Sequence, residues 1–266
     1  MVATSKLKRA QDRVVAARPY ARALADVLGE LYSPELAERF ALLRQPAGGV
    51  RRVALLLITS NRGLCGAFNS NLIREARRRL ADLEGQGSTV DLHLIGRKGM
   101  NYFKFQKRTP ASQRSDIGDR PTAEHATELI APLIGQFERG EVDAVEVVFA
   151  KFNSPVSTPP NTLRILPVTP PQAEAGSGGR SNYILRPSAE VILDRLLPLY
   201  VKNQLYRALV ETAAGEQGAR RTAMKNATDA AGDMLDVLRR TFNRARQGQI
   251  TQELSEIVGG AEALQG

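Results

Sequence analysis

The chain's only cysteine lies in a short stretch whose residue types could bind a phosphate or supply a thiol nucleophile. The segment TSNRGLCGAFNSN (59–71) follows the apolar run VALLLI and places Cys65 between Gly63 and Gly66. A strand, a glycine turn and a helix in this order are typical of phosphate sites. A Walker loop, however, requires wider glycine spacing followed by Gly-Lys-Ser/Thr, and a dinucleotide loop requires GxGxxG. The segment fits neither pattern, so we predict a tight turn with Asn69 or Ser70 as helix cap, and no bound cofactor.

Thiol and metal chemistry have few candidate residues. A catalytic cysteine needs a base and an orienting group, and the chain offers only His93 and His125. We expect His93 within a strand and His125 in solvent near the start of a helix. A single cysteine excludes an internal disulfide and any CxxC site. We therefore predict no catalytic residue and no metal site.

Composition and charge limit the classes of partner. The 266 residues suffice for one or two domains, and the net charge of +9 indicates an acidic protein surface, a nucleic acid or an anionic membrane. The arginine clusters at 77–79, 220–221 and 239–240 lack interleaved aromatic residues and nucleic-acid motifs. We assign them to solvated helix faces, or to faces matched to an acidic protein. No run approaches the roughly 18 apolar residues of a membrane span, so we expect a soluble protein or one held at a membrane through partners.

The chain begins with a heptad pattern. One row consists of Leu7, Val14, Ala21 and Leu28, and a second of Ala3, Ala10, Ala17, Leu24 and Leu31. This spacing predicts a coiled-coil helix over residues 1–45. Pro19 should kink or interrupt it, and Ser33 with Pro34 indicates a new helix start.

The middle of the chain alternates between strand and helix patterns. Strands are predicted at 52–60, 89–96, 142–152 and, more weakly, 161–168 and 183–187, and helices at 68–84, 97–105 and 121–140. Residues 169–182 have the composition of a loop. This order predicts a Rossmann-like parallel sheet covered by helices, over residues 46–186.

The last segment, 187–266, is a second long heptad helix. Met224, Ala231, Leu238 and Ala245 form one row, Ala227 and Met234 a second, and Ile250, Leu254, Ile257, Ala261 and Leu264 continue in a shifted phase. A continuous helix here would be on the order of 100 Å long and must lie against another helix or inside a partner. The overall prediction is an α/β fold: an antiparallel coiled coil of the terminal helices, with the sheet domain between them.

Three motifs resemble those of one family, the γ subunits of F-type ATP synthases. The end segment ITQELSEIVGGAEA (250–263) resembles the family's C-terminal signature, with Glu253 two residues after Thr251, an acidic residue three further on, and then Gly-Ala. The turn SNRGLCG (60–66) followed by NSN resembles the end of the family's first strand. MVATSKLKRAQDRVVAARPYA (1–21) is similar to its N-terminal coiled-coil helix. Together they extend over essentially the whole chain.

The resemblance implies a rotating central shaft that is not itself an enzyme. Its terminal helices would enter the hexamer of alpha and beta subunits, and its sheet domain would bind the epsilon subunit and the membrane ring of c subunits. Ion flow through the ring would turn the shaft and change the catalytic sites. Arg246, Gln247 and Thr251 correspond to the family's contacts with catalytic-subunit loops, although they could equally be ordinary polar helix surface. Cys65 then becomes a packed turn residue.

The resemblance also implies a location and leaves alternatives. It places the protein at the cytoplasmic face of a bacterial membrane, as a peripheral subunit with no lipid insertion and no nucleic acid. The family's N-terminal helix begins several turns earlier than this sequence, so we expect the apolar row from Ile250 onward to lack its partner as written. A basic coiled-coil adaptor or nucleic-acid-binding protein is the first alternative. A small α/β enzyme acting at 63–66 is the second.

Overall fold

The computed structural model describes residues 2–32, 38–46, 49–169 and 188–263. It divides into two compact units, Met1–Thr222 and Ala223–Gly266. In chain order the elements are α1 (Val2–Leu31), η1 (Ala41–Leu43), β1 (Arg52–Ile58), α3 (Phe68–Gly85), β2 (Thr89–Ile95), α4 (Arg97–Phe105), β3 (Ser112–Arg114), α5 (Ala123–Glu138), β4 (Ala144–Ala150), β5 (Pro160–Leu166) and α6 (Ala189–Ala263). The first unit holds the sheet and the helices around it, and the second consists of the C-terminal part of α6.

The sheet has the order β3-β2-β1-β4-β5. β1 pairs in parallel with β2 and β4, and β2 with β3, which confirms the predicted α/β fold with a parallel sheet. β5 differs, because it pairs antiparallel with β4 and makes the sheet mixed. The connection over 151–159 contains no helix, and it is too short for the crossover that a parallel pair requires.

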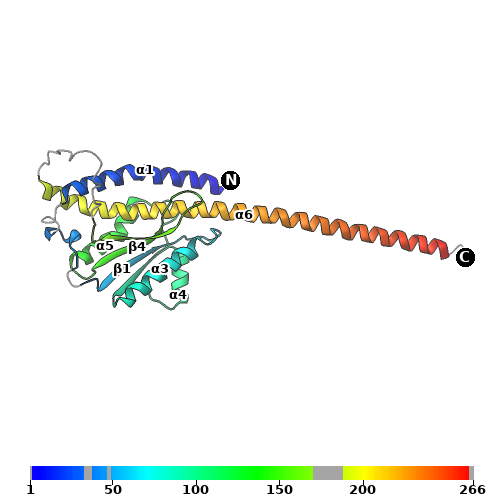
Figure 1. Ribbon diagram of the computed structural model, residues 1–266, viewed down its shortest axis with the longest axis horizontal. Helices are drawn as coiled ribbons and strands as arrows, with labels where there is room; N and C mark the ends of the chain where they lie inside the picture. Colours follow the sequence, from blue (N-terminus) through cyan, green and yellow to red (C-terminus); the bar gives the residue numbers. More distant parts are fainter. Residues whose placement is uncertain (1, 33–37, 47–48, 170–187, 264–266) are drawn as a thin grey trace. The chain divides into compact units, whose positions relative to one another are not determined.

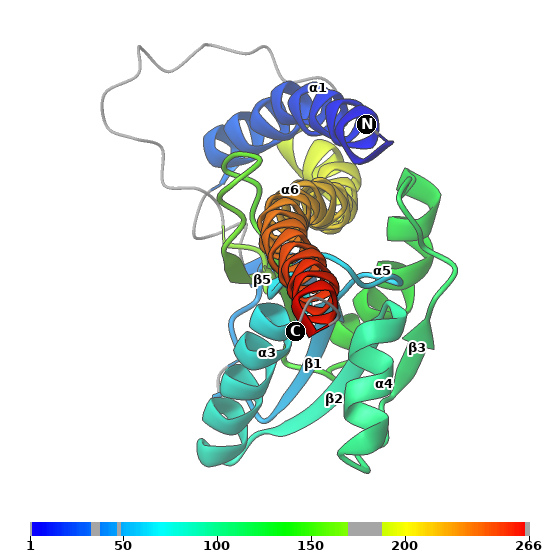
Figure 2. The same cartoon turned by 90° about the vertical axis from the view of Figure 1, so that its right-hand side faces the viewer.

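Helices cover both faces of the sheet, and the central strands β1 and β4 are accordingly buried at every position except Arg52. Leu56 and Val147 belong to a core shared with α5, the first part of α6 and the end of α1. Leu55 and Leu57 belong to a second core with α3, α4 and Cys65. Figure 2 shows α3 and α4 on the side of the sheet away from α1. The predicted amphipathic face of α3 is confirmed by five buried side chains, those of Leu72, Ile73, Ala76, Leu80 and Leu83.

The heptad rows of α1 form the predicted antiparallel pairing with α6 inside the first unit (Figure 1). The buried row members are Leu7, Ala10, Val14, Ala21, Leu24, Leu28 and Leu31, whereas Ala17 is half-buried. Leu28 lies in one cluster with Leu193 and Leu197, and Leu7 lies in another with Val210 and Ala214. The helix is not interrupted at Pro19.

The partner row on α6 differs from the predicted one. The residues that pack with α1 lie between Leu193 and Ala214, N-terminal to the predicted rows that begin at Met224. The physical reason is length, because the 30 residues of α1 extend only about 45 Å along a partner helix. The predictions for Ser33, Pro34, Leu264 and the strand at 183–187 fall outside the described residues, as do most of the loop at 169–182 and the side chain of Ala3.

The second unit is a single helix with an exposed surface. From Lys225 to Ala261 every side chain that the structure describes is exposed. The large apolar ones are Met234, Leu235, Val237, Leu238, Phe242, Ile250, Leu254, Ile257 and Val258. Within the described parts of the chain, no helix combines the length and apolarity needed to cross a membrane.

Candidate functional site

The natural place for a ligand in this sheet is the crevice where the strand order reverses. In open α/β sheets such crevices lie beyond the carboxyl ends of the strands, here at Ile58 of β1 and Ala150 of β4. Helix α6 fills this position. The Ala150 amide donates a hydrogen bond to Thr212 Oγ1 at 3.2 Å. A Cβ on Gly215 would lie 3.3 Å from that of Ala150, so only glycine permits this approach without adjustment.

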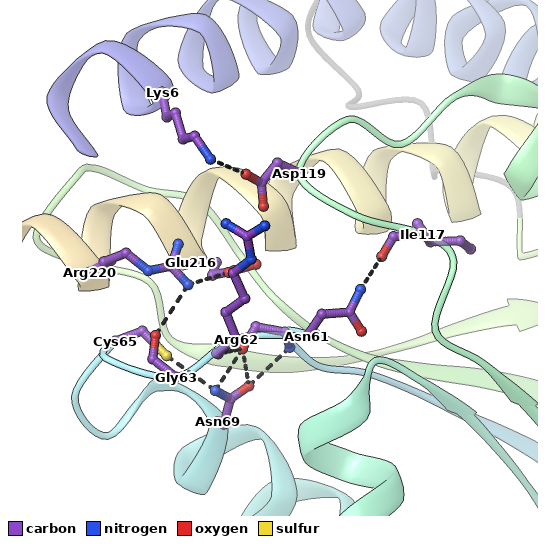
Figure 3. Close-up of polar contacts among 11 residues, drawn as sticks. Lys6, Asn61, Arg62, Gly63, Cys65, Asn69, Ile117, Asp119, Glu216 and Arg220 are labelled. Atoms are coloured by element: carbon purple, nitrogen blue, oxygen red, sulfur yellow. Dashed lines mark hydrogen bonds and ion pairs between the residues drawn. The ribbon is translucent and has the colours of Figure 1, made fainter. Parts of the chain in front are cut away.

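The glycine turn at 61–66 is held in place by side-chain hydrogen bonds within the protein. Asn69 accepts a hydrogen bond from the Ser60 amide at 3.0 Å, and its Nδ2 donates to Ser60 Oγ at 2.8 Å and to Cys65 Sγ at 3.1 Å (Figure 3). Asn69 is therefore a turn residue. The prediction that it or Ser70 caps the helix is wrong, because α3 has Ala67 at its N-cap with no side-chain bond.

Cys65 is a packed residue, as the resemblance implied. Its side chain is buried in the core with Phe68 and Leu72. Burial raises the pKa of its thiol, and the opposing hydrogen bonds and the charge of Arg220 do not offset that effect. Because the thiolate is the nucleophilic form, a buried thiol with a raised pKa is unreactive.

The N-terminus of α4 is satisfied in the same way. Free amides at a helix start commonly bind anions. Here the Arg97 amide donates to Asn61 Oδ1 at 3.0 Å, and the Gly99 amide donates to Thr59 Oγ1 at 3.0 Å. The residue before the helix, Gly96, has φ 97° and no room for a Cβ. The turn and the helix start thus form a closed structure rather than a phosphate cradle.

Charged groups tie α6 to the turn and α1 to the rest of the unit (Figure 3). Arg220 Nη2 lies 2.5 Å from Glu216 Oε1 and donates to the Gly63 carbonyl at 3.4 Å. Lys6 of α1 pairs with Asp119 at 2.7 Å. Burial raises the pKa of Glu216, although Arg220 partly opposes the shift. We call the contacts of residues 211–220 with the turn and with the end of β4 the crevice joint.

The histidines belong to separate local structures. His93 Nδ1 lies 2.7 Å from Ser112 Oγ on the neighbouring strand, and burial lowers its pKa. His125 forms a capping box with Thr122 at the start of α5 and is half-buried rather than solvated. Among the residues that the structure describes, no hydrogen bond joins either ring to Cys65. In the described part of the chain, no group of three or more His, Cys, Asp or Glu side chains could hold a metal ion.

Sequence reasoning missed a buried ion cluster within the sheet. The Glu146 carboxylate is 2% exposed and accepts hydrogen bonds from Arg79 at 2.6 and 2.7 Å and from Arg164 at 3.0 and 3.2 Å. The prediction of a solvated face, or of one matched to an acidic protein, is wrong for Arg79 and Arg220, whose side chains are 24% and 16% exposed and pair within the chain. The available signal was the single acidic residue in the strand AVEVVFA, because a charge at a buried position needs a partner.

The predicted partner-contact residues lie together on the exposed helix of the second unit. Arg246, Gln247 and Thr251 are all exposed. Thr251 Oγ1 donates to the Gln247 carbonyl at 2.9 Å, which turns the hydroxyl back onto its own helix. They lie in a stretch, 237–252, that contains no acidic residue and four arginines, Arg239, Arg240, Arg244 and Arg246. We call this stretch the basic belt.

The fold and the crevice joint define a class of protein: an α/β domain fixed to a pair of antiparallel terminal helices. Residues 1–264 match the family described as ATP synthase. The ATP synthase gamma chain of Gemmatimonas aurantiaca is 61% identical, over 100% of this chain and 91% of the relative, and that of Symbiobacterium thermophilum is 42% identical with the same coverage. The chain therefore belongs to the ATP synthase gamma chain family.

Solved structures agree with this fold. The central stalk and c-ring structure of the Tetrahymena thermophila mitochondrial ATP synthase contains a chain with a TM-score of 0.63 at 24% identity, covering 86% of this chain and 96% of that one. A chain in the Euglena gracilis structure of OSCP, F1 and c-ring gives 0.58 at 17% identity, covering 98% and 95%. At these identities the likeness concerns the fold alone.

Proposed function

We propose that this chain is the rotating central shaft of a bacterial ATP synthase and has no catalytic site of its own. ATP synthesis and rotary function follow from the family. The observation that carries the shaft role is the exposed helix at 225–263, whose apolar side chains face solvent. An unsupported helix with such a surface is unfavourable in water, so it requires a surrounding partner.

The proposed partner of this helix is the hexamer of alpha and beta subunits. Arg246, Gln247 and Thr251 would contact loops of the catalytic subunits, with acidic groups facing the basic belt. Ion pairs between exposed side chains contribute only about 0–1 kcal/mol. Such weak pairs suit a contact that must break and form again as the shaft turns.

The first unit would connect this helix to the rest of the rotor. We propose that its sheet domain binds the epsilon subunit and the ring of c subunits, at the cytoplasmic face of the membrane and without lipid insertion. The predicted segments 1–45, 46–186 and 187–266 would then serve as stabilising helix, rotor-binding domain and shaft. The crevice joint supports this division of roles, because it fixes α6 to the sheet domain at the place where related folds bind ligands.

Reconstitution tests the shaft role. The chain is mixed with purified alpha and beta subunits of its source, and ATP hydrolysis is measured beside co-elution. We expect no hydrolysis by the chain alone and hydrolysis by the complex. Arg246→Gln should reduce hydrolysis several-fold, because an exposed ion pair contributes up to about 1 kcal/mol. Arg221→Gln, at an exposed arginine outside the basic belt, should leave hydrolysis within about twofold.

Two outcomes would count against the proposal. Equal effects of both substitutions would remove the special role of the basic belt. A chain that fails to bind the hexamer but binds DNA or RNA in a salt-sensitive, sequence-selective way would favour the adaptor alternative instead.

A further inference from the structure

A basic hollow in the first unit lies beside the crevice joint, with which it shares Glu211, and it contains no residue of the exposed helix at 225–263. It measures about 340 Å³ and lies where the end of β4 meets α1 and α6. Its polar lining consists of Arg18 and Arg22 from α1, Lys151 and Asn153 after β4, and Arg207 and Glu211 from α6. This volume falls in the range of about 300–1,000 Å³ that is common for small-molecule sites.

The hollow has an excess of positive charge. Four cationic side chains surround one carboxylate. That carboxylate, Glu211, already accepts hydrogen bonds from the Phe152 amide at 3.1 Å and from Arg207 at 3.4 Å. It therefore cannot neutralise the remaining cations.

Two of the four cations have no side-chain partner among the residues that the structure describes. Arg18 donates to the Phe152 carbonyl at 3.2 Å, which holds its guanidinium at the wall of the hollow. Arg22, one helical turn further along α1, and Lys151 form no ion pair with any residue that the structure describes. Side chains one turn apart project on the same helix face, so Arg18 and Arg22 approach the hollow together.

We infer that this hollow binds a compact anion with several negative charges, of the phosphate or short-polyphosphate type. Guanidinium groups bind phosphate oxygens through paired hydrogen bonds, and lysine adds a point charge. Cations that converge from three separate elements in one concave site concentrate the positive potential there. An extended acidic peptide would need a groove rather than a single hollow. The site is independent of the proposed shaft role, because it contains no residue of the second unit.

Calorimetric titration of the full chain with sodium tripolyphosphate at constant ionic strength tests the inference. The test variant is Arg22→Gln with Lys151→Gln, which removes two unpaired cations and breaks no described bond. The matched control is Arg9→Gln with Lys104→Gln, which makes the same charge change at two exposed positions outside the hollow. We expect saturable one-site binding that the test variant weakens at least tenfold and the control changes by less than about twofold, since charge-assisted bonds are individually strong.

Two further experiments identify whether the phosphate group comes from a soluble compound or from a lipid headgroup. Inorganic phosphate is titrated in the same way, and phosphatidylcholine vesicles with and without phosphatidylglycerol are tested for competition with tripolyphosphate. Competition that depends on phosphatidylglycerol and is lost in the test variant would assign the site to lipid headgroups, whereas its absence would assign it to a soluble phosphate compound. Absence of saturable binding, equal weakening in both double variants, or binding of polyglutamate without tripolyphosphate would overturn the inference.

Discussion

Replacing Gly218 by alanine tests how tightly α6 is held in the crevice joint. Gly218 lies on α6 against the loop that follows β4. A Cβ at this position would lie 2.6 Å from the Pro155 carbonyl oxygen and 3.3 Å from the Pro155 carbonyl carbon and Cα. Because those atoms belong to the backbone, no side-chain rotation can relieve the contact. The helix or the loop must therefore move.

Two opposing effects set the size of the change. Overpacking of a close-fitted site costs about 1–3 kcal/mol, while alanine in place of glycine inside a helix gains roughly 0.5–1 kcal/mol. We therefore expect Gly218→Ala to lower the free energy of unfolding of the first unit by up to about 2.5 kcal/mol. A domain of this size loses about 2–4 °C of Tm for each kcal/mol.

Urea and thermal unfolding, followed by circular dichroism, measure this change. Gly232→Ala is the matched control in the same helix, because nothing lies within 4 Å of the Cβ it would add. That variant should only gain helix stability, by up to about 1 kcal/mol. If Gly218→Ala proved more stable than the parent chain, α6 would not be held closely at the crevice joint, and our account of the joint would be wrong.

Three further predictions concern buried polar groups of the first unit. Gln217 is 2% exposed, and neither polar atom of its side chain has a hydrogen-bond partner among the described residues, so Gln217→Leu should raise the free energy of unfolding by about 1–3 kcal/mol in urea titration; a loss of stability would contradict this account. Glu146→Gln should cost about 2–3 kcal/mol, less than a fully buried pair because Arg79 and Arg164 are partly exposed; a neutral effect would contradict this. Burial tends to raise the pKa of Glu146, but its two arginines outweigh that effect and the net shift is downward from 4.5. The parent should therefore lose stability as the pH falls below about 4.5, while Glu146→Gln shows a flatter profile there. Cys65 should react with a thiol reagent only as fast as the chain opens, and rapid labelling of the native protein would refute its burial.

The local patterns of the sequence were sufficient to predict most of the helices and strands. The heptad rows of α1 and the apolar face of α3 repeat with the helical period, and the short, largely apolar runs of β1 and β4 have the length of buried strands. The turn motif and the C-terminal signature pointed to the family. These features depend on neighbouring residues alone, so the sequence is enough to find them.

Contacts between distant residues were decided only by the tertiary structure. The polar strand β3 and the antiparallel direction of β5 depend on which strand edges are available for pairing. The solvated-face prediction failed for Arg79, because its partner Glu146 lies far away in the sequence on β4. It failed for Arg220, because α6 packs against the sheet domain there and buries the pair with Glu216. The seam of α6 that packs on α1 depends on where the two helices meet. The sequence by itself thus determined the periodic elements and the family, whereas tertiary packing decided that the protein's own helix fills the ligand crevice, because long-range close approach leaves no local pattern.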